Sequence, residues 1–282
     1  MRLLLSLESA ALLDEWSLPG GWLDSAGPRA SWRDPAAEQT RRRVQIGRAY
    51  LALQPDIAPD GREAIVSAGP PGAGKTTYLR DEGLLPQTFR DLDADVVKDL
   101  LLEDGLARGR WGDLLAHALP DGNPLRPAEL APLVHRESNA IIDVLRRRAI
   151  RLGESVVIQG TLGWNGTPDA LLAELTPAGY ERLTIVDIEV GEDEAMQRAR
   201  ERWWRGRIDP ASRLGGRFLP QVAIRQLFDG AGGSHCASHA QLLFERSTIR
   251  PTRLLRRVDG SSTATPADET KSQGATRGAG SA

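Results

Sequence analysis

The chain of 282 residues has one cysteine, three lysines and almost no net charge, and these shortages exclude several classes of protein. Because Cys236 is the only cysteine, an intrachain disulfide framework and a zinc site built from several cysteines are ruled out. The same shortage favours a reducing compartment, and we expect a cytoplasmic protein. The 36 basic and 38 acidic residues leave a net charge of −2, so no global positive field attracts nucleic acid or an anionic membrane. Any binding of phosphate must therefore come from a local site.

Long uninterrupted apolar runs are also missing. Residues 1–14 are rich in leucine and carry a basic residue, as a signal peptide does, but Glu8 interrupts them and no membrane-spanning stretch follows. This pattern favours an amphipathic helix over a removable signal, and it predicts no membrane partner.

Apolar runs and helical patterns alternate along the middle of the chain. The pattern predicts buried strands at residues 64–68, 89–92, 155–159 and 183–188, and helices at residues 95–103, 128–152, 169–175 and 192–204. Parallel strands need crossover connections, which helices supply. The alternation therefore predicts an α/β fold with a mostly parallel sheet and helices on both faces.

The sequence divides into three segments. Residues 1–60 are rich in tryptophan, proline and arginine, with a helix predicted at 38–53, and we interpret them as a helical N-terminal extension. Residues 61–258 make up the predicted α/β domain. Residues 259–282 contain no bulky apolar side chain and cannot bury enough surface to offset the cost of ordering, so we predict a disordered tail.

Directly after the first predicted strand, the chain matches the P-loop pattern G-x-x-x-x-G-K-[ST]. Glycines in such a loop let backbone N–H groups surround phosphate oxygens, and the next helix adds the positive end of its dipole. Lys75 would reach the β- and γ-phosphates, and the Thr76 hydroxyl would bind Mg²⁺. With only three lysines in the chain, an incidental lysine here is an unattractive alternative. The residues predicted to bind ATP or GTP are Gly69, Pro70, Pro71, Gly72, Ala73, Gly74, Lys75, Thr76 and Thr77.

Two carboxylates, Asp93 and Asp95, follow the second predicted strand, at the edge where α/β sheets hold their ligands. One of them could take the proton of an acceptor hydroxyl, and the other could order Mg²⁺-bound water. Capping of the next helix explains either residue equally well.

Arginines gather later in the chain, with Arg200, Arg202 and Arg205 on a predicted helix and Arg217 after two glycines. Two arginines on a hinged lid could close over a γ-phosphate and neutralise charge during transfer. An arginine-rich helix is otherwise usually a solvated face, but the glycines favour a hinged segment.

Taken together, these motifs resemble the zeta toxins, a family of P-loop kinases that includes UDP-N-acetylglucosamine 3′-kinases and is related to chloramphenicol phosphotransferases. The resemblance covers about residues 65–228. It rests on the P-loop, on Asp-x-Asp-x-x-Lys at 93–98, on Val-His-Arg-Glu-Ser at 134–138, on Gly-Thr at 160–161, on Glu-Arg-Trp at 201–203 and on Gly-Arg-Phe-Leu-Pro at 216–220.

The resemblance implies a P-loop NTPase fold and a transfer of phosphate from ATP or GTP, with Mg²⁺, to a hydroxyl of a small molecule such as a nucleotide sugar. It also implies an antitoxin protein as partner. By resemblance Asp95 is the base, and Lys75, Arg202 and Arg217 bind phosphate. The residues expected near the acceptor are Asp93, His135, Glu137 and Thr161. Gln159 departs from the family, which commonly has an acidic residue before Gly-Thr.

Two alternatives stay open. The acceptor could be an antibiotic, a nucleoside or a polynucleotide 5′ end, or the protein could be a switch that binds nucleotide without transferring phosphate. Two further clusters favour structural explanations: His235, Cys236 and His239 lack a fourth metal ligand, and the arginines at 41–43 suit a solvated helix face.

Overall fold

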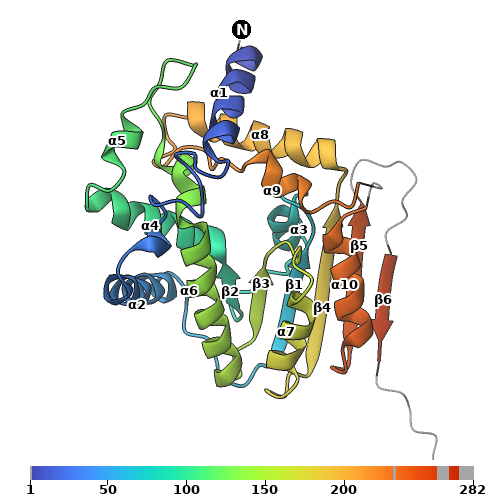
Figure 1. The fold of residues 1–282 in the computed structure, drawn as a ribbon. Helices are drawn as coiled ribbons and strands as arrows, with labels where there is room; N and C mark the ends of the chain where they lie inside the picture. Colours follow the sequence, from blue (N-terminus) through green and yellow to red (C-terminus); the bar gives the residue numbers. More distant parts are fainter. Residues whose placement is uncertain (1, 231–232, 259–266, 273–282) are drawn as a thin grey trace, which may run out of the picture.

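A computed structural model of the chain describes residues 2–230, 233–258 and 267–272. These residues form one six-stranded sheet with helices packed around it (Figure 1). The strands are β1 (Glu63–Ala68), β2 (Arg90–Asp93), β3 (Val156–Gln159), β4 (Arg182–Glu189), β5 (Thr252–Val258) and β6 (Ala267–Lys271). They lie in the order β2-β3-β1-β4-β5-β6, and only β6 is antiparallel to its neighbour. The four predicted strands and the mostly parallel sheet are confirmed, whereas β5 and β6 were not predicted.

Helices precede, connect and cover these strands. They are α1 (Arg2–Trp16), η1 (Ser31–Arg33), α2 (Ala36–Ala52), α3 (Lys75–Asp81), α4 (Ala94–Ala107), α5 (Gly112–Leu115), η2 (Pro127–Leu130), α6 (Ala131–Leu152), α7 (Thr167–Leu175), α8 (Glu192–Ile208), α9 (Gln221–Arg225) and α10 (His235–Arg246). None in the described ranges is long and apolar enough to cross a bilayer.

The sheet is buried on both faces because its strands carry apolar side chains on both. In β1, Ala64 and Val66 belong to the larger core, beneath α2, α4, α6, α7 and α10, whereas Ile65 belongs to the smaller core, beneath α3, α8 and α9. Neighbouring residues of a strand point to opposite faces, so a continuous apolar run serves both layers. The helices accordingly lie on both sides of the sheet (Figure 1).

The N-terminal extension packs against the open edge of the sheet, where β2 has only one neighbouring strand. Tyr50 lies in the last turn of α2. Its hydroxyl donates to the Asp91 carbonyl at 2.7 Å and accepts from the Asp93 N–H at 2.8 Å. Gln54 donates to the same carbonyl at 2.8 Å and accepts from the Asp91 N–H at 3.1 Å. Side chains thus take the place of a further strand and fix the position of β2.

The C-terminal segment departs in part from the predicted disordered tail. Ala267–Lys271 forms β6 and pairs with β5 from Thr252–Lys271 to Arg256–Ala267. A strand without bulky apolar side chains is stable here because the backbone ladder and ion pairs such as Arg257 to Asp268, at 2.8 Å, hold it at the edge. The other residues of the predicted tail lie outside the described residues.

Candidate active site

The P-loop connects β1 to α3, and its glycines have the conformations that a tight loop needs. Gly69 has φ +122°, and a Cβ there would lie 1.9 Å from the Ile188 carbonyl oxygen. Gly72 has φ +84°, and a Cβ there would meet the Ala195 carbonyl oxygen at 2.9 Å. Any side chain at these positions would push the loop away from β4 and α8.

Lys75 begins α3 and folds back over the loop. Its ammonium group donates to the carbonyl oxygens of Gly69 and Pro70, each at 2.8 Å. Desolvation by the surrounding loop lowers the pKa of Lys75 to about 8, and the charge of Arg202 acts in the same direction. The lysine charge is thus held at the centre of the loop, where phosphate oxygens would approach it.

Thr76 contacts the end of β3. Its hydroxyl donates to Gln159 Oε1 at 3.2 Å, and Gln159 Nε2 donates to Asp91 Oδ1 at 2.7 Å. The described residues include no group of three His, Cys, Asp or Glu side chains that could hold a metal ion alone. Two neutral oxygens beside a phosphate loop nevertheless suit Mg²⁺, which takes oxygen ligands and completes its shell with phosphate and water. The residues present therefore fit a nucleotide-bound Mg²⁺.

Asp93 and Asp95 have different surroundings although they are two residues apart. Asp93 caps α4, because its Oδ1 accepts from the Asp95 N–H at 2.8 Å. Burial, together with the nearby charge of Asp95, raises the pKa of Asp93 to about 6. The capping alternative considered for either residue therefore applies to Asp93, and it leaves the Asp95 carboxylate available for another role.

Asp95 is surrounded by positive charge. Its carboxylate lies 2.8 Å from Lys98 Nζ and 2.8 Å from Arg217 Nη1. Burial acts to raise the pKa of Asp95, but Lys98 and Arg217 outweigh it and hold that pKa well below its usual range. Asp95 is consequently ionised at neutral pH and able to accept a hydrogen bond from a hydroxyl group.

The arginines expected on the lid divide into two positions. Arg217 contacts the acceptor side, because its guanidinium also bonds Asp99 Oδ1 at 2.6 Å and the Asp95 carbonyl at 3.0 Å. Arg202 is exposed on α8 and has no hydrogen bond or ion pair within the described residues, but its charge lowers the pKa of both Lys75 and Asp95. The Arg202 guanidinium therefore lies close enough to both Lys75 and Asp95 for its charge to act on them.

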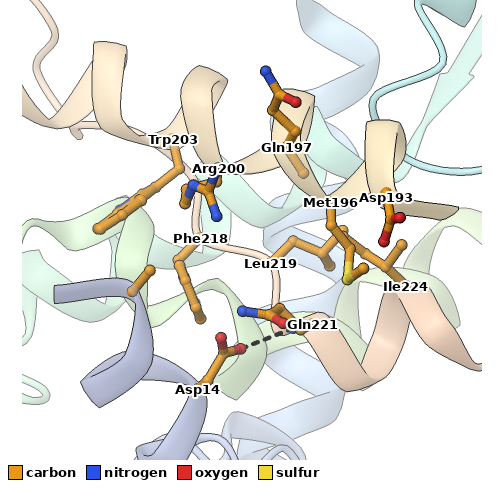
Figure 2. A pocket seen from close by; sticks show the side chains of 12 residues that line it. Asp14, Asp193, Met196, Gln197, Arg200, Trp203, Phe218, Leu219, Gln221 and Ile224 are labelled. Carbon is orange, nitrogen blue, oxygen red and sulfur yellow. Dashed lines mark hydrogen bonds between the residues drawn. The ribbon is translucent and has the colours of Figure 1, made fainter. Parts of the chain in front are cut away.

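Arg200 points to a different part of the molecule. It lines a cavity of about 230 Å³ between α1, α8 and the segment that leads into α9, with Trp203 and Phe218 among the walls (Figure 2). On the far wall the Asp14 carboxylate accepts from the Gln221 N–H at 2.8 Å, at the start of α9. Arg205 is exposed. Of the three arginines predicted as candidates on this helix, Arg202 is the one whose charge acts on both Lys75 and Asp95.

The last turns of α8 are fixed in the core by Trp203, which belongs to the Glu-Arg-Trp motif, and by Arg207, which no motif identified. Trp203 is fully buried and donates to Glu129 Oε1 at 2.8 Å. Arg207 is buried and pairs with Glu129 at 2.8 Å and with Asp121 at 2.6 Å. The helix that carries Arg202 is therefore a rigid support, and any hinge lies after it.

His135 and Thr161 belong to different parts of the fold. His135 is on the first turns of α6, where desolvation and the charge of Lys98 lower its pKa to about 4. The Thr161 carbonyl accepts from the Gly69 N–H at 3.1 Å, and its hydroxyl accepts from the Gly163 N–H at 3.2 Å. His135 is thus a neutral ring near Lys98, whereas Thr161 supports the P-loop.

Glu137 was predicted near the acceptor, and the structure contradicts this prediction. The Glu137 carboxylate is fully buried and lies 2.8 Å from Arg42 Nη2 of α2. Residues two apart on a helix point in different directions, so His135 and Glu137 cannot share a pocket. The same ion pair corrects the interpretation of residues 41–43, because Arg42 is buried and only its neighbours retain solvent contact.

Replacing Glu137 with alanine should lower the free energy of unfolding by about 3 kcal/mol, because Arg42 would keep a buried charge without its main partner. Chemical denaturation measures the effect. His135→Ala, an exposed change on the same helix, should stay within about 0.5 kcal/mol of the unaltered protein. A Glu137→Ala variant with normal stability but impaired acceptor binding would show that Glu137 acts in the acceptor pocket after all.

Two acids at the end of β4, one buried and one half-buried, were also not identified from the sequence. Asp187 Oδ2 lies 2.7 Å from Arg256 Nε, and Glu189 lies beyond it toward Lys75. Burial and the charge of Asp187 raise the pKa of Glu189 to about 8. Nearby on α10, Cys236 is buried and His239 bonds the Leu162 carbonyl at 2.7 Å. His239 and Cys236 therefore take part in packing between α10 and the sheet.

No protein-family model and no curated protein matches the sequence. Among solved structures, the chain is similar to one from the PezAT chromosomal toxin–antitoxin system of Streptococcus pneumoniae, with a TM-score of 0.51 and 17% identity over 79% of each chain. The likeness shows a shared fold, a mostly parallel six-stranded sheet with helices on both faces. The fold expected from the resemblance is thereby confirmed.

A structure of AvrRxo1-ORF1:-ORF2 with ATP is also similar, with a TM-score of 0.45 and 14% identity over 83% of this chain and 63% of that chain. The native AvrRxo1-ORF1:-ORF2 complex has a TM-score of 0.48 and 15% identity over 92% of this chain and 75% of that chain.

Proposed function

We propose that this protein is a kinase that transfers the γ-phosphoryl group of ATP, or of GTP, to a hydroxyl of a small molecule. The observation that carries the proposal is the position of Asp95 relative to the P-loop. An ionised carboxylate at the end of β2 lies close enough to Lys75 for the two charges to influence each other, with Arg202 acting on both. Binding of nucleotide alone does not require a carboxylate there.

The residues divide the reaction between them. The N–H groups of the P-loop and the Lys75 ammonium would hold the β- and γ-phosphates. Asp95 would accept the proton of the acceptor hydroxyl while that oxygen bonds to the γ-phosphorus and the bond to the β-γ bridging oxygen breaks, releasing ADP or GDP. Because the transition state of phosphoryl transfer is loose, a carboxylate with a low pKa suffices, and its main contribution is to orient the hydroxyl.

Thr76 would hold Mg²⁺ together with the nucleotide, supported by Gln159. When bound, this ion would neutralise charge on the β- and γ-phosphates. Arg202 and Arg217 would add positive charge from α8 and from the loop after it, so that the transferred group is surrounded by cations on several sides.

A nucleotide sugar such as UDP-N-acetylglucosamine is our first candidate for the acceptor, because the motifs resemble kinases of that substrate. We also propose an antitoxin as a protein partner. The PezAT chain, which belongs to a toxin–antitoxin system, has the same fold and supports this proposal. An antibiotic, a nucleoside or a polynucleotide 5′ end are the alternative acceptors.

The proposal is tested by incubating the purified protein with ATP, or GTP, and Mg²⁺ together with a panel of hydroxyl acceptors. Mass spectrometry should find an acceptor that gains one phosphate in a reaction that depends on Lys75. Nucleotide binding without a phosphorylated product from any acceptor class would instead support a nucleotide-dependent switch.

Replacing Asp95 with asparagine should lower kcat about 100-fold and leave the affinity for ATP within about twofold, because the isosteric amide cannot accept the proton. Asp93→Asn keeps an oxygen that can cap α4 and should have the smaller effect on the chemical step. Single-turnover kinetics with radiolabelled ATP separate the two variants. A larger loss in Asp93→Asn would exchange the roles of the two carboxylates.

A further inference from the structure

Three side chains form a line from the P-loop to the outer strand of the sheet. Thr76 Oγ1 donates to Gln159 Oε1 at 3.2 Å, and Gln159 Nε2 donates to Asp91 Oδ1 at 2.7 Å. In the sheet Asp91 pairs with Val157, so Gln159 lies two residues further along β3, on the same face, within reach of a long side chain. The line therefore crosses from β2 to β3 and ends at the expected Mg²⁺ ligand.

The chemistry of the groups decides which way the Gln159 amide points. An ionised carboxylate only accepts hydrogen bonds, so the end of the amide that faces Asp91 must be the NH₂ group. The carbonyl oxygen must then face Thr76. Without Asp91, the Gln159 side chain could turn its NH₂ group toward Thr76. The positive end of that group would repel a cation there.

The direction of the Thr76 hydrogen bond matters for the metal. Because the hydroxyl gives its proton to Gln159, the lone pairs of the Thr76 oxygen stay free for a cation. Ligands that are oriented by a second partner bind metals more tightly, and loss of such a partner typically costs 10- to 100-fold in metal affinity.

The backbone around Asp91 is fixed, as this role would require. Its carbonyl and N–H are bonded by Tyr50 and Gln54, so the N-terminal extension sets the place of the carboxylate. The Asp91 side chain itself is half-buried beside β3. The start of the line, at the Asp91 backbone, is thus held in place by α2 and the residues after it.

We propose that Asp91 is a positioning residue for the nucleotide-bound Mg²⁺, acting through the amide of Gln159. The inference rests on the proposed function, since it presupposes that Mg²⁺ and a nucleotide bind at Thr76. It also gives the glutamine at position 159 a role: the negative charge lies on the neighbouring strand at Asp91, and the neutral Gln159 oxygen orients the Thr76 hydroxyl.

Calorimetric titration with a non-hydrolysable ATP analogue, with Mg²⁺ and with EDTA in its place, tests the role without measuring catalysis. In the unaltered protein Mg²⁺ should tighten binding. In Asp91→Asn the affinity measured with EDTA should stay within about twofold, whereas the tightening by Mg²⁺ should fall about 10-fold. Electron paramagnetic resonance with Mn²⁺ and the same nucleotide should show the same loss of bound metal.

A double-mutant cycle separates positioning from a simple effect of charge. If Asp91 acts through Gln159, the Gln159→Ala variant also loses the tightening, and adding Asp91→Asn to it changes nothing further. If the two losses multiply, the Asp91 charge acts on the metal directly and the inference is wrong. Thermal unfolding of each variant shows that it is folded, and Asp143→Asn, on the outer side of α6, serves as the control substitution.

Unchanged tightening by Mg²⁺ in Asp91→Asn would overturn the inference and leave the proposed function intact. A protein that binds no ATP analogue in any condition would overturn the proposed function, and the inference with it.

Discussion

Lys75→Ala should abolish phosphoryl transfer, with kcat at least about 1000-fold below that of the unaltered protein. The lysine provides the positive charge inside the P-loop, and its ammonium group already bonds two carbonyls of that loop. The other two lysines lie on other elements, Lys98 on α4 and Lys271 on β6, and cannot replace Lys75 in the P-loop. Nucleotide affinity should also fall, because the charge contacts the ground state as well as the transition state.

The pKa of Lys75 gives this prediction a second measurement. With a pKa of about 8 before nucleotide binds, the ammonium form dominates below pH 8 and disappears above it. ADP affinity of the unaltered protein should therefore fall as the pH rises through about 8, and the Lys75→Ala variant should not show this dependence. Near-normal turnover of the variant would refute the assignment of the P-loop as the phosphate site.

Arg202→Ala and Arg217→Ala should each lower kcat on the order of 1000-fold, the size of effect seen when an arginine that stabilises transferred phosphate is lost. KM for ATP should change less, because these contacts form mainly with the transition state. Arg205→Ala should stay within about twofold, since Arg202, and not Arg205, is among the charges that act on the pKa values of Lys75 and Asp95. Single-turnover assays of the three variants, run side by side, measure the difference.

A pH profile distinguishes the two active arginines. Arg217 contacts Asp95 and lowers its pKa, so its removal should raise that pKa and move the acid limb of the rate profile to higher pH. Arg202→Ala should move it less, because Arg202 acts from further away. Equal and mild losses in all three variants would show that these arginines only form a solvated surface and do not act on the transferred phosphate.

The sequence was informative about the fold wherever apolar runs were continuous. The strands near residues 64–68, 155–159 and 183–188 were predictable because both of their faces are buried. β5 was not, because three arginines interrupt it. In the structure Arg256 pairs with Asp187 of β4 and Arg257 with Asp268 of β6, contacts that join residues far apart in the sequence.

The candidate site shows the same limit. The P-loop and the two carboxylates are local motifs, and the sequence located them. Glu137 was placed near the acceptor by the resemblance alone, and its buried partner Arg42 is 95 positions away in the sequence. Asp91 was missed because its partner Gln159 is 68 positions away, and a single aspartate in a strand carries no pattern of its own.

The place of β2 at the edge of the sheet limits how the chain can be shortened. A chain that starts at residue 61, where the predicted α/β domain begins, would lack Tyr50 and Gln54. The N–H and carbonyl groups of Asp91 would then be left unpaired. A bare strand edge is a template for strands of other molecules. A protein trimmed in this way should aggregate even if its P-loop still folds, so residues that carry none of the sequence motifs would determine whether the protein stays in solution.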